Sequence, residues 1–170
     1  REAEGLLGDD YVILCVGELN RNKNQDKLIS AAKLLKNQIP QLKILLAGNG
    51  ARESEYQRQI EELGLTGTVK LIGYRTDLEH ITPDADLIVS CSRREGLPLN
   101  ILEAMLCGKP VLASHNRGHN ELVEEGKTGF LVDADDVDAY ANRICQLYQD
   151  RLLSVSMGQE GFTKAQSYTA

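Results

Sequence analysis

The chain has 170 residues, of which 42% are hydrophobic and 26% are charged. This balance is typical of one globular domain and excludes disordered, collagen-like and fibrous proteins. The 19 Lys and Arg residues and 25 Asp and Glu residues give a net charge of −6, so non-specific binding to nucleic acid or anionic lipid is not expected.

The cysteines and the apolar stretches indicate the cellular environment in which the chain folds. The cysteines at 15, 91, 107 and 145 form no C-x-x-C pair, and most lie in apolar runs, which predicts buried, reduced thiols and a reducing compartment. No apolar stretch is long enough for a membrane span, and no signal segment opens the chain. Because the sequence starts on Arg-Glu-Ala-Glu-Gly and stops on Ser-Tyr-Thr-Ala, we expect a fragment of a longer protein.

Short apolar runs alternate with longer amphipathic stretches along the chain. The runs predict strands at 11–16, 42–46, 69–72, 87–89, 110–113 and 128–132. Most are continuous rather than alternating, as strands covered on both faces are. Helical spacing of apolar residues predicts helices at 24–38, 54–63, 98–107 and 136–149.

This alternation is typical of βαβ units with right-handed crossovers. The predicted fold class is α/β, a doubly wound parallel sheet of about six strands, in one domain over residues 1–170. Ligands of such sheets bind outside the carboxyl ends of the strands. Function is therefore expected in the loops at 17–24, 47–53, 73–77, 90–98 and 114–121.

The loop at 90–98 has the features of an anion-binding site. It leads into a helix that begins at Pro98, a favoured first-turn residue. Gly96 allows a close backbone approach or a positive φ. The free N–H groups around Gly96, Leu97 and Leu99 could hold a diphosphate, helped by the helix dipole. The alternative is an ordinary turn before a helix.

The helix at 98–107 is apolar almost all round, which predicts a central, buried helix. Glu103 lies in its middle, and a buried carboxylate needs a hydrogen-bonding partner. A sugar diol is a good candidate, while a structural ion pair or a rotamer that reaches solvent is the alternative. Glu95 precedes Glu103 by eight residues, so both could face one crevice.

The whole string from Arg93 to Val111 resembles the signature of the retaining glycosyltransferases called group 1 or family 4. It contains Glu-x7-Glu and ends in Glu-Ala-Met-x-x-Gly-x-Pro-Val. The resemblance continues in order over residues 9–150, through the stretches at 16–19, 46–50, 71–74, 84–87 and 121–132. It implies the GT-B fold of two facing Rossmann-like domains, of which this chain would be the C-terminal, donor-binding one.

The resemblance also implies roles for matching residues. Glu95 would be the catalytic residue that faces the donor sugar near the reacting carbon, and Glu103 would hold the ribose hydroxyls. Lys23 would pair with the diphosphate, and Gly17 on the same loop would also contact the donor. Diphosphate and sugar would also contact the backbone of Gly96, Leu97, Pro98 and Leu99, and the nucleobase would pass the backbone of Gly73, Tyr74 and Arg75.

The first loop departs from the family after Gly17. Many relatives carry an arginine there that also grips the diphosphate, whereas this chain has Glu18, which cannot do so. Arg21 lies on the same loop and could replace that arginine. An exposed arginine on a polar loop is the alternative interpretation.

The implied reaction moves a sugar from a nucleotide diphosphate sugar to an acceptor hydroxyl with retention of configuration. No metal or cofactor is implied, because Lys23 and the helix start at Pro98 would stabilise the leaving phosphate. The implied partners are the donor and an absent N-terminal acceptor domain, without nucleic acid but with peripheral membrane contact through that domain. A cytoplasmic, bacterial enzyme of envelope or exopolysaccharide synthesis is expected, and the isolated chain should bind nucleotide weakly without transferring sugar. The alternatives are a non-catalytic nucleotide-sugar-binding module, a GT-B epimerase or phosphorylase, and an interaction module.

Other patterns have weaker interpretations. Asp84-Ala85-Asp86 spells a D-x-D, but it lies at the start of a strand, on the edge away from the expected site. Gly48-Asn49-Gly50 lacks the third glycine of a dinucleotide fingerprint. A metal pair of His115 and His119 is not expected, although His119 and Asn120 could reach a sugar or phosphate if a helix starts at Gly118.

Overall fold

The computed structural model describes residues 4–168 and confirms the predicted fold class. One sheet of parallel strands has the order β3-β2-β1-β4-β5-β6. Its strands are β1 (Tyr11–Val16), β2 (Leu42–Ala47), β3 (Val69–Gly73), β4 (Leu87–Ser90), β5 (Val111–Ser114) and β6 (Gly129–Val132). The chain builds outward from β1 in one direction and then from β4 in the other, so the topological switch point lies between these two strands.

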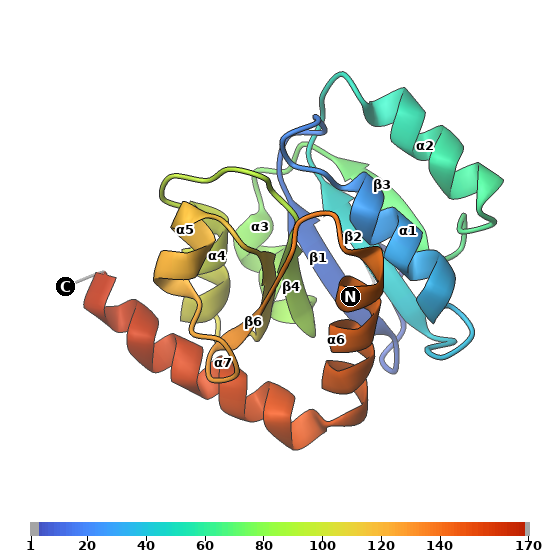
Figure 1. The fold of residues 1–170 in the computed structure, drawn as a ribbon. Coiled ribbons are helices and arrows are strands. Elements are labelled where there is room, and N and C mark those ends of the chain that lie inside the picture. Colours follow the sequence, from blue (N-terminus) through green and yellow to red (C-terminus); the bar gives the residue numbers. More distant parts are fainter. Residues whose placement is uncertain (1–3, 169–170) are drawn as a thin grey trace.

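Helices cover both faces of the sheet (Figure 1). One face carries α1 (Asp26–Leu35), α2 (Glu53–Glu62) and α6 (Val137–Gln149), and the other carries α3 (Leu78–Ile81), α4 (Leu99–Leu106) and α5 (Arg117–Leu122). The helix α7 (Arg151–Ala165) passes from one side to the other, because Met157 packs in the first core and Ala165 in the second. Two short 3₁₀ helices are η2 (Thr82–Asp84) and η3 (Gln166–Tyr168).

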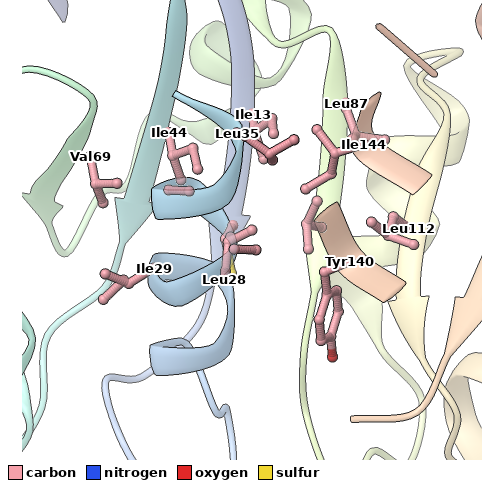
Figure 2. Close-up of a cluster of buried hydrophobic side chains, with 14 of the residues drawn as sticks. Ile13, Leu28, Ile29, Leu35, Ile44, Val69, Leu87, Leu112, Tyr140 and Ile144 are labelled. Carbon is pink, nitrogen blue, oxygen red and sulfur yellow. The ribbon is translucent and has the colours of Figure 1, made fainter. Parts of the chain in front are cut away.

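Successive strand residues alternate between two buried cores, which explains the continuous apolar runs. Ile13 and Ile44 face α1 and α6, whose Leu28 and Ile144 pack over them (Figure 2). Val12 and its neighbours along the other face belong to the core beneath α4 and α5. The sheet is therefore buried on both sides, and its carboxyl edge presents the loops.

The boundaries of the predicted elements agree with the structure to within about three residues, but three helices were not predicted: the short α3 and α5, and the long α7. No element was predicted after 149, whereas α7 runs from Arg151 to Ala165. Two of its buried residues are Gly158 and Gly161, and its Leu152 is 84% exposed, so its apolar residues mark no single face. The start of α7 depends instead on Asp150, whose side chain accepts a hydrogen bond from the Leu153 amide.

The prediction of buried thiols is only partly right. All four cysteines are free; Cys15 and Cys91 are buried, but Cys107 is exposed and Cys145 is half-buried. Cys107 follows the last residue of α4, where the chain turns at the surface. Between residues 4 and 168, no helix combines the length and apolarity that a membrane span requires.

The ends of the predicted domain, residues 1–3 and 169–170, lie outside the described residues.

Candidate functional site

The candidate site lies where the β1–α1 and β4–α4 loops leave the sheet on either side of the switch point. Asn22 joins the two loops through three hydrogen bonds. Its carbonyl accepts from the Arg93 amide at 2.8 Å, and its side chain exchanges hydrogen bonds with the Arg94 backbone at 3.1 and 3.2 Å. The loops that carry Lys23 and Glu95 are thus one connected unit.

Asn24 extends this connection to a third loop, and sequence reasoning missed it. It is buried and has a left-handed backbone with φ 61°, a conformation that asparagine tolerates better than most residues. Its side-chain amide donates to the Cys91 carbonyl at 3.2 Å and to the Ala134 carbonyl at 2.8 Å. Its position after a strand, in a loop rich in asparagine, was the available signal.

Lys23 and Glu95 form an ion pair, with 2.5 Å between Nζ and Oε1. The side chains are 25% and 13% exposed, so the pair is partly shielded from water. Burial alone would raise the pKa of Glu95, but hydrogen bonds from Lys23 and Ser92 and the positive charge of Lys23 outweigh it and lower that pKa. Glu95 is therefore a fixed anion at neutral pH.

The close packing of two loops at the carboxyl edge requires Gly48. A Cβ atom built on Gly48 would lie 2.0 Å from the Gly17 carbonyl oxygen, which no side chain could tolerate. The Leu19 amide donates to the Asn49 carbonyl at 2.8 Å along the same contact. The Gly-Asn-Gly stretch thus supports the β1–α1 loop, and Gly17 lies against the aliphatic part of Lys23.

The start of α5 supports the turn that carries Glu95. Asn116 caps this helix by accepting from the His119 amide at 2.8 Å, and it donates to the Ser92 carbonyl at 3.0 Å. The Gly118 amide donates to the Glu95 carbonyl at 3.1 Å, and a Cβ on Gly118 would lie 2.4 Å from the Gly96 carbonyl oxygen. Gly118 is thus required at this contact, whereas Gly96 has no positive φ and a Cβ on it would meet no protein atom within 4 Å.

His119 is fully buried beneath this turn. Its Nδ1 lies 2.7 Å from the Ser114 carbonyl oxygen, which places the ring proton on Nδ1. Its Nε2 is buried and has no hydrogen-bond partner within the described residues. Burial lowers the pKa of His119, although the Ser114 hydrogen bond and the charge of Glu95 act in the opposite direction. The imidazole is therefore neutral at pH 7.

The prediction that Glu103 is buried is wrong. Glu103 and Leu99 lie on the exposed side of α4, and only Ile101, Ala104 and Met105 are buried. The apolar sequence of α4 therefore does not mark a helix that is buried all round, because only one side of it packs in the core. Leu97 and Leu99 are each 60% exposed.

Glu103 instead borders an open cavity of about 390 Å³ beside the β3–α3 loop. The exposed Tyr74 belongs to this loop, which Gly73 starts with a positive φ of 74°. The Arg75 guanidinium is held by ion pairs with Asp77 at 2.9 Å and with Glu4. The other residues that line the cavity are Thr76, Leu78, Glu79, Thr82, Leu106 and Cys107.

The remaining sequence candidates are spread over the surface. Arg21 is exposed and forms no ion pair within the described part of the chain, so nothing shows that it replaces the arginine missing at Glu18. Asp86 accepts from the Val12 amide at 2.8 Å, at the amino end of β4 and away from the site. His115 is exposed and contacts Asn120 at 3.2 Å. No group of three His, Cys, Asp or Glu side chains suited to a metal occurs among residues 4–168.

Comparison with known proteins gives a consistent set of similarities. The family model "Glycosyl transferases group 1" matches residues 1–164. EpsD of Bacillus subtilis is 44% identical over 161 residues, which is 95% of this chain and 42% of that protein. A UDP-Gal:alpha-D-GlcNAc-diphosphoundecaprenol alpha-1,3-galactosyltransferase of Escherichia coli is 31% identical over 89% of this chain and 40% of its own length. The crystal structure of HepE from Anabaena in complex with UDP-glucose has a TM-score of 0.91 at 31% identity, over 98% of this chain and 46% of that one.

Proposed function

Because the chain belongs to the group 1 glycosyl transferases, we propose that it is the donor-binding domain of a retaining glycosyltransferase. The longer protein would move a sugar from a nucleotide diphosphate sugar to an acceptor hydroxyl. The chain spans about two fifths of the length of the curated relatives it matches, so the acceptor side of this reaction is assigned to a second domain.

The observation that carries the proposal is the Lys23–Glu95 pair at the switch point of the sheet. Open α/β sheets bind ligands at this point. Lys23 supplies a compact positive charge for a diphosphate, and Glu95 supplies a fixed carboxylate that can accept hydrogen bonds from sugar hydroxyls. A nucleotide diphosphate sugar carries a diphosphate on its anomeric carbon and a hydroxyl on the neighbouring ring carbon, so one ligand could contact both side chains.

The nucleoside is assigned to the cavity beside Glu103. An exposed carboxylate that borders a cavity can accept hydrogen bonds from two neighbouring ribose hydroxyls. Arg75 lines the same cavity, and the base would pass the backbone of Gly73, Tyr74 and Arg75 in the adjoining loop. The complex of HepE with UDP-glucose supports the binding of a nucleotide sugar by this fold.

The chemical contribution of the domain is electrostatic. Negative charge builds on the leaving phosphate as the glycosidic bond breaks, and a fixed cation there lowers the barrier. Lys23 would supply this cation. The backbone amides of Gly96, Leu97 and Leu99, at the start of α4, would donate hydrogen bonds to the same phosphate. Glu95 would position the sugar rather than act through a covalent bond.

Calorimetric titration of the chain with UDP, GDP and ADP tests the proposal. We expect binding of at least one of them, weakened about tenfold by Glu103→Ala. Glu62→Ala removes an exposed glutamate at the end of α2 and should leave binding unchanged. Absence of binding by all three nucleotides, or equal effects of the two variants, would overturn it.

A further inference from the structure

A second cavity has Glu95 in its lining and shares no lining residue with the cavity beside Glu103. It has a volume of about 550 Å³ and is lined by Arg93, Arg94, Glu95, Gly96, Asn116 and Arg117. Three of its six lining residues are arginines, although the chain as a whole carries a net charge of −6. The cavity lining therefore carries a local excess of positive charge.

The charges around the cavity do not cancel. Arg93 is neutralised by Asp135, with 2.7 Å between Nη2 and Oδ1. Glu95 is neutralised by Lys23. Arg94 and Arg117 have no ion pair anywhere in residues 4–168, so two guanidinium charges remain at this cavity. By contrast, Arg52, Arg75 and Arg143 each reach a carboxylate of the chain.

The backbones that carry the two arginines are fixed. Asn22 holds the Arg94 amide and carbonyl, as described above. Arg117 is the first residue of α5, between the cap residue Asn116 and the Gly118 amide that donates to the Glu95 carbonyl. Two exposed guanidinium groups thus project from rigid supports that are tied to the turn of Glu95.

We propose that this cavity is an anion subsite, in which Arg94 and Arg117 bind a phosphate or carboxylate group of a substrate. Planar guanidinium groups suit such groups because they can donate two parallel hydrogen bonds. The inference rests on the proposed function, which assigns the donor's own diphosphate to Lys23. The anion is therefore carried by the acceptor, as a phosphate, or by the transferred sugar, as a carboxylate.

The test is an NMR titration of the chain saturated with the nucleoside diphosphate that binds best. Inorganic phosphate and glucuronate are the probes, and glucose is the neutral control. We expect both anions to shift the amide signals of Arg94, Gly96, Arg117 and Gly118. Tighter binding of phosphate indicates a phosphate-bearing acceptor, and tighter binding of glucuronate indicates an acidic sugar.

A double variant, Arg94→Gln with Arg117→Gln, should weaken anion binding about tenfold and leave nucleotide binding intact. Arg58→Gln is the matched control. Arg58 is an exposed arginine of α2 that also has no ion pair within the described residues. Anion binding that is absent, or equal in the double variant and the control, overturns the subsite. Absence of nucleotide binding by the unmodified chain would instead refute the proposed function.

Discussion

The Lys23 ammonium and the Glu95 carboxylate are each other's ion-pair partner, 2.5 Å apart, across two loops separated by 72 residues. One residue is assigned to the diphosphate and the other to the sugar. A diphosphate that binds Lys23 therefore competes with Glu95 for the same cation. This competition separates the effect of Glu95 on binding from its effect on transfer.

Glu95→Gln should leave the affinity of the chain for a nucleoside diphosphate unchanged or increase it. The substitution removes a negative charge that competes for Lys23 and that repels the phosphates. Isothermal calorimetry at low salt measures the effect. A loss of affinity beyond about tenfold would show that Glu95 itself holds the nucleotide.

The same substitution should reduce turnover of the full-length enzyme by about 100-fold or more, because the proposed function places this carboxylate on the sugar where charge develops. Initial rates of sugar transfer measure this. Glu62→Gln, on the surface of α2, is the control and should keep normal turnover. Near-normal turnover of the Glu95 variant would remove Glu95 from the reaction.

Lys23→Met should weaken binding of the diphosphate about tenfold and hardly change binding of the nucleoside alone. The methionine side chain keeps most of the apolar contact with Gly17 but has no charge. Titration of the unmodified chain and of the Lys23→Met variant with UDP and with uridine makes the comparison. Equal losses for the two ligands would indicate a general disturbance of the loop rather than a missing phosphate contact.

Gly118→Ala should destabilise the fold by about 1–3 kcal/mol, because the new methyl group would lie 2.4 Å from the Gly96 carbonyl oxygen. The strain acts on the turn that holds Glu95, so transfer should fall as well. Chemical denaturation measures the stability. Gly67→Ala is the matched control, since a Cβ there meets nothing within 4 Å and φ is ordinary, and it should change stability by less than about 0.5 kcal/mol.

The sheet could be predicted from the sequence because most of its strands are buried on both faces and read as nearly continuous apolar runs. The Lys23 and Glu95 loops could be placed because parallel strands put all their following loops at one edge. Glu103 shows the limit of this reasoning. Its helix has no polar face in the sequence, so the composition predicted burial, whereas Glu103 is exposed in the structure.

Side-chain support of the site could not be predicted, because it depends on contacts between distant residues. Asn24 reaches Ala134 across 110 positions, and Gly118 meets Gly96 through a backbone contact without any sequence signal. The helix α5 has only six residues, too few for a periodic pattern. Its start nevertheless positions both His119 and the turn of Glu95.

Acidification should destabilise the chain partly through His119. The pKa of this buried imidazole is lowered from its ordinary value of 6.5, so the folded state takes up the proton less readily than the unfolded state. Its contribution to stability is complete above pH 6.5 and declines as the pH falls below that value. The lowered pKa of Glu95 has the same sign but acts below its ordinary value of 4.5.

Urea unfolding at pH 7.5 and pH 5.5 isolates the histidine, because Glu95 stays ionised in both states over this range. His119→Asn retains a short side-chain donor for the Ser114 carbonyl but cannot titrate, so its stability should fall less between the two pH values. His80→Asn is the matched control, since His80 is 78% exposed and its removal should leave the wild-type pH dependence. If the His119 variant keeps the full decline, the buried imidazole does not cause it.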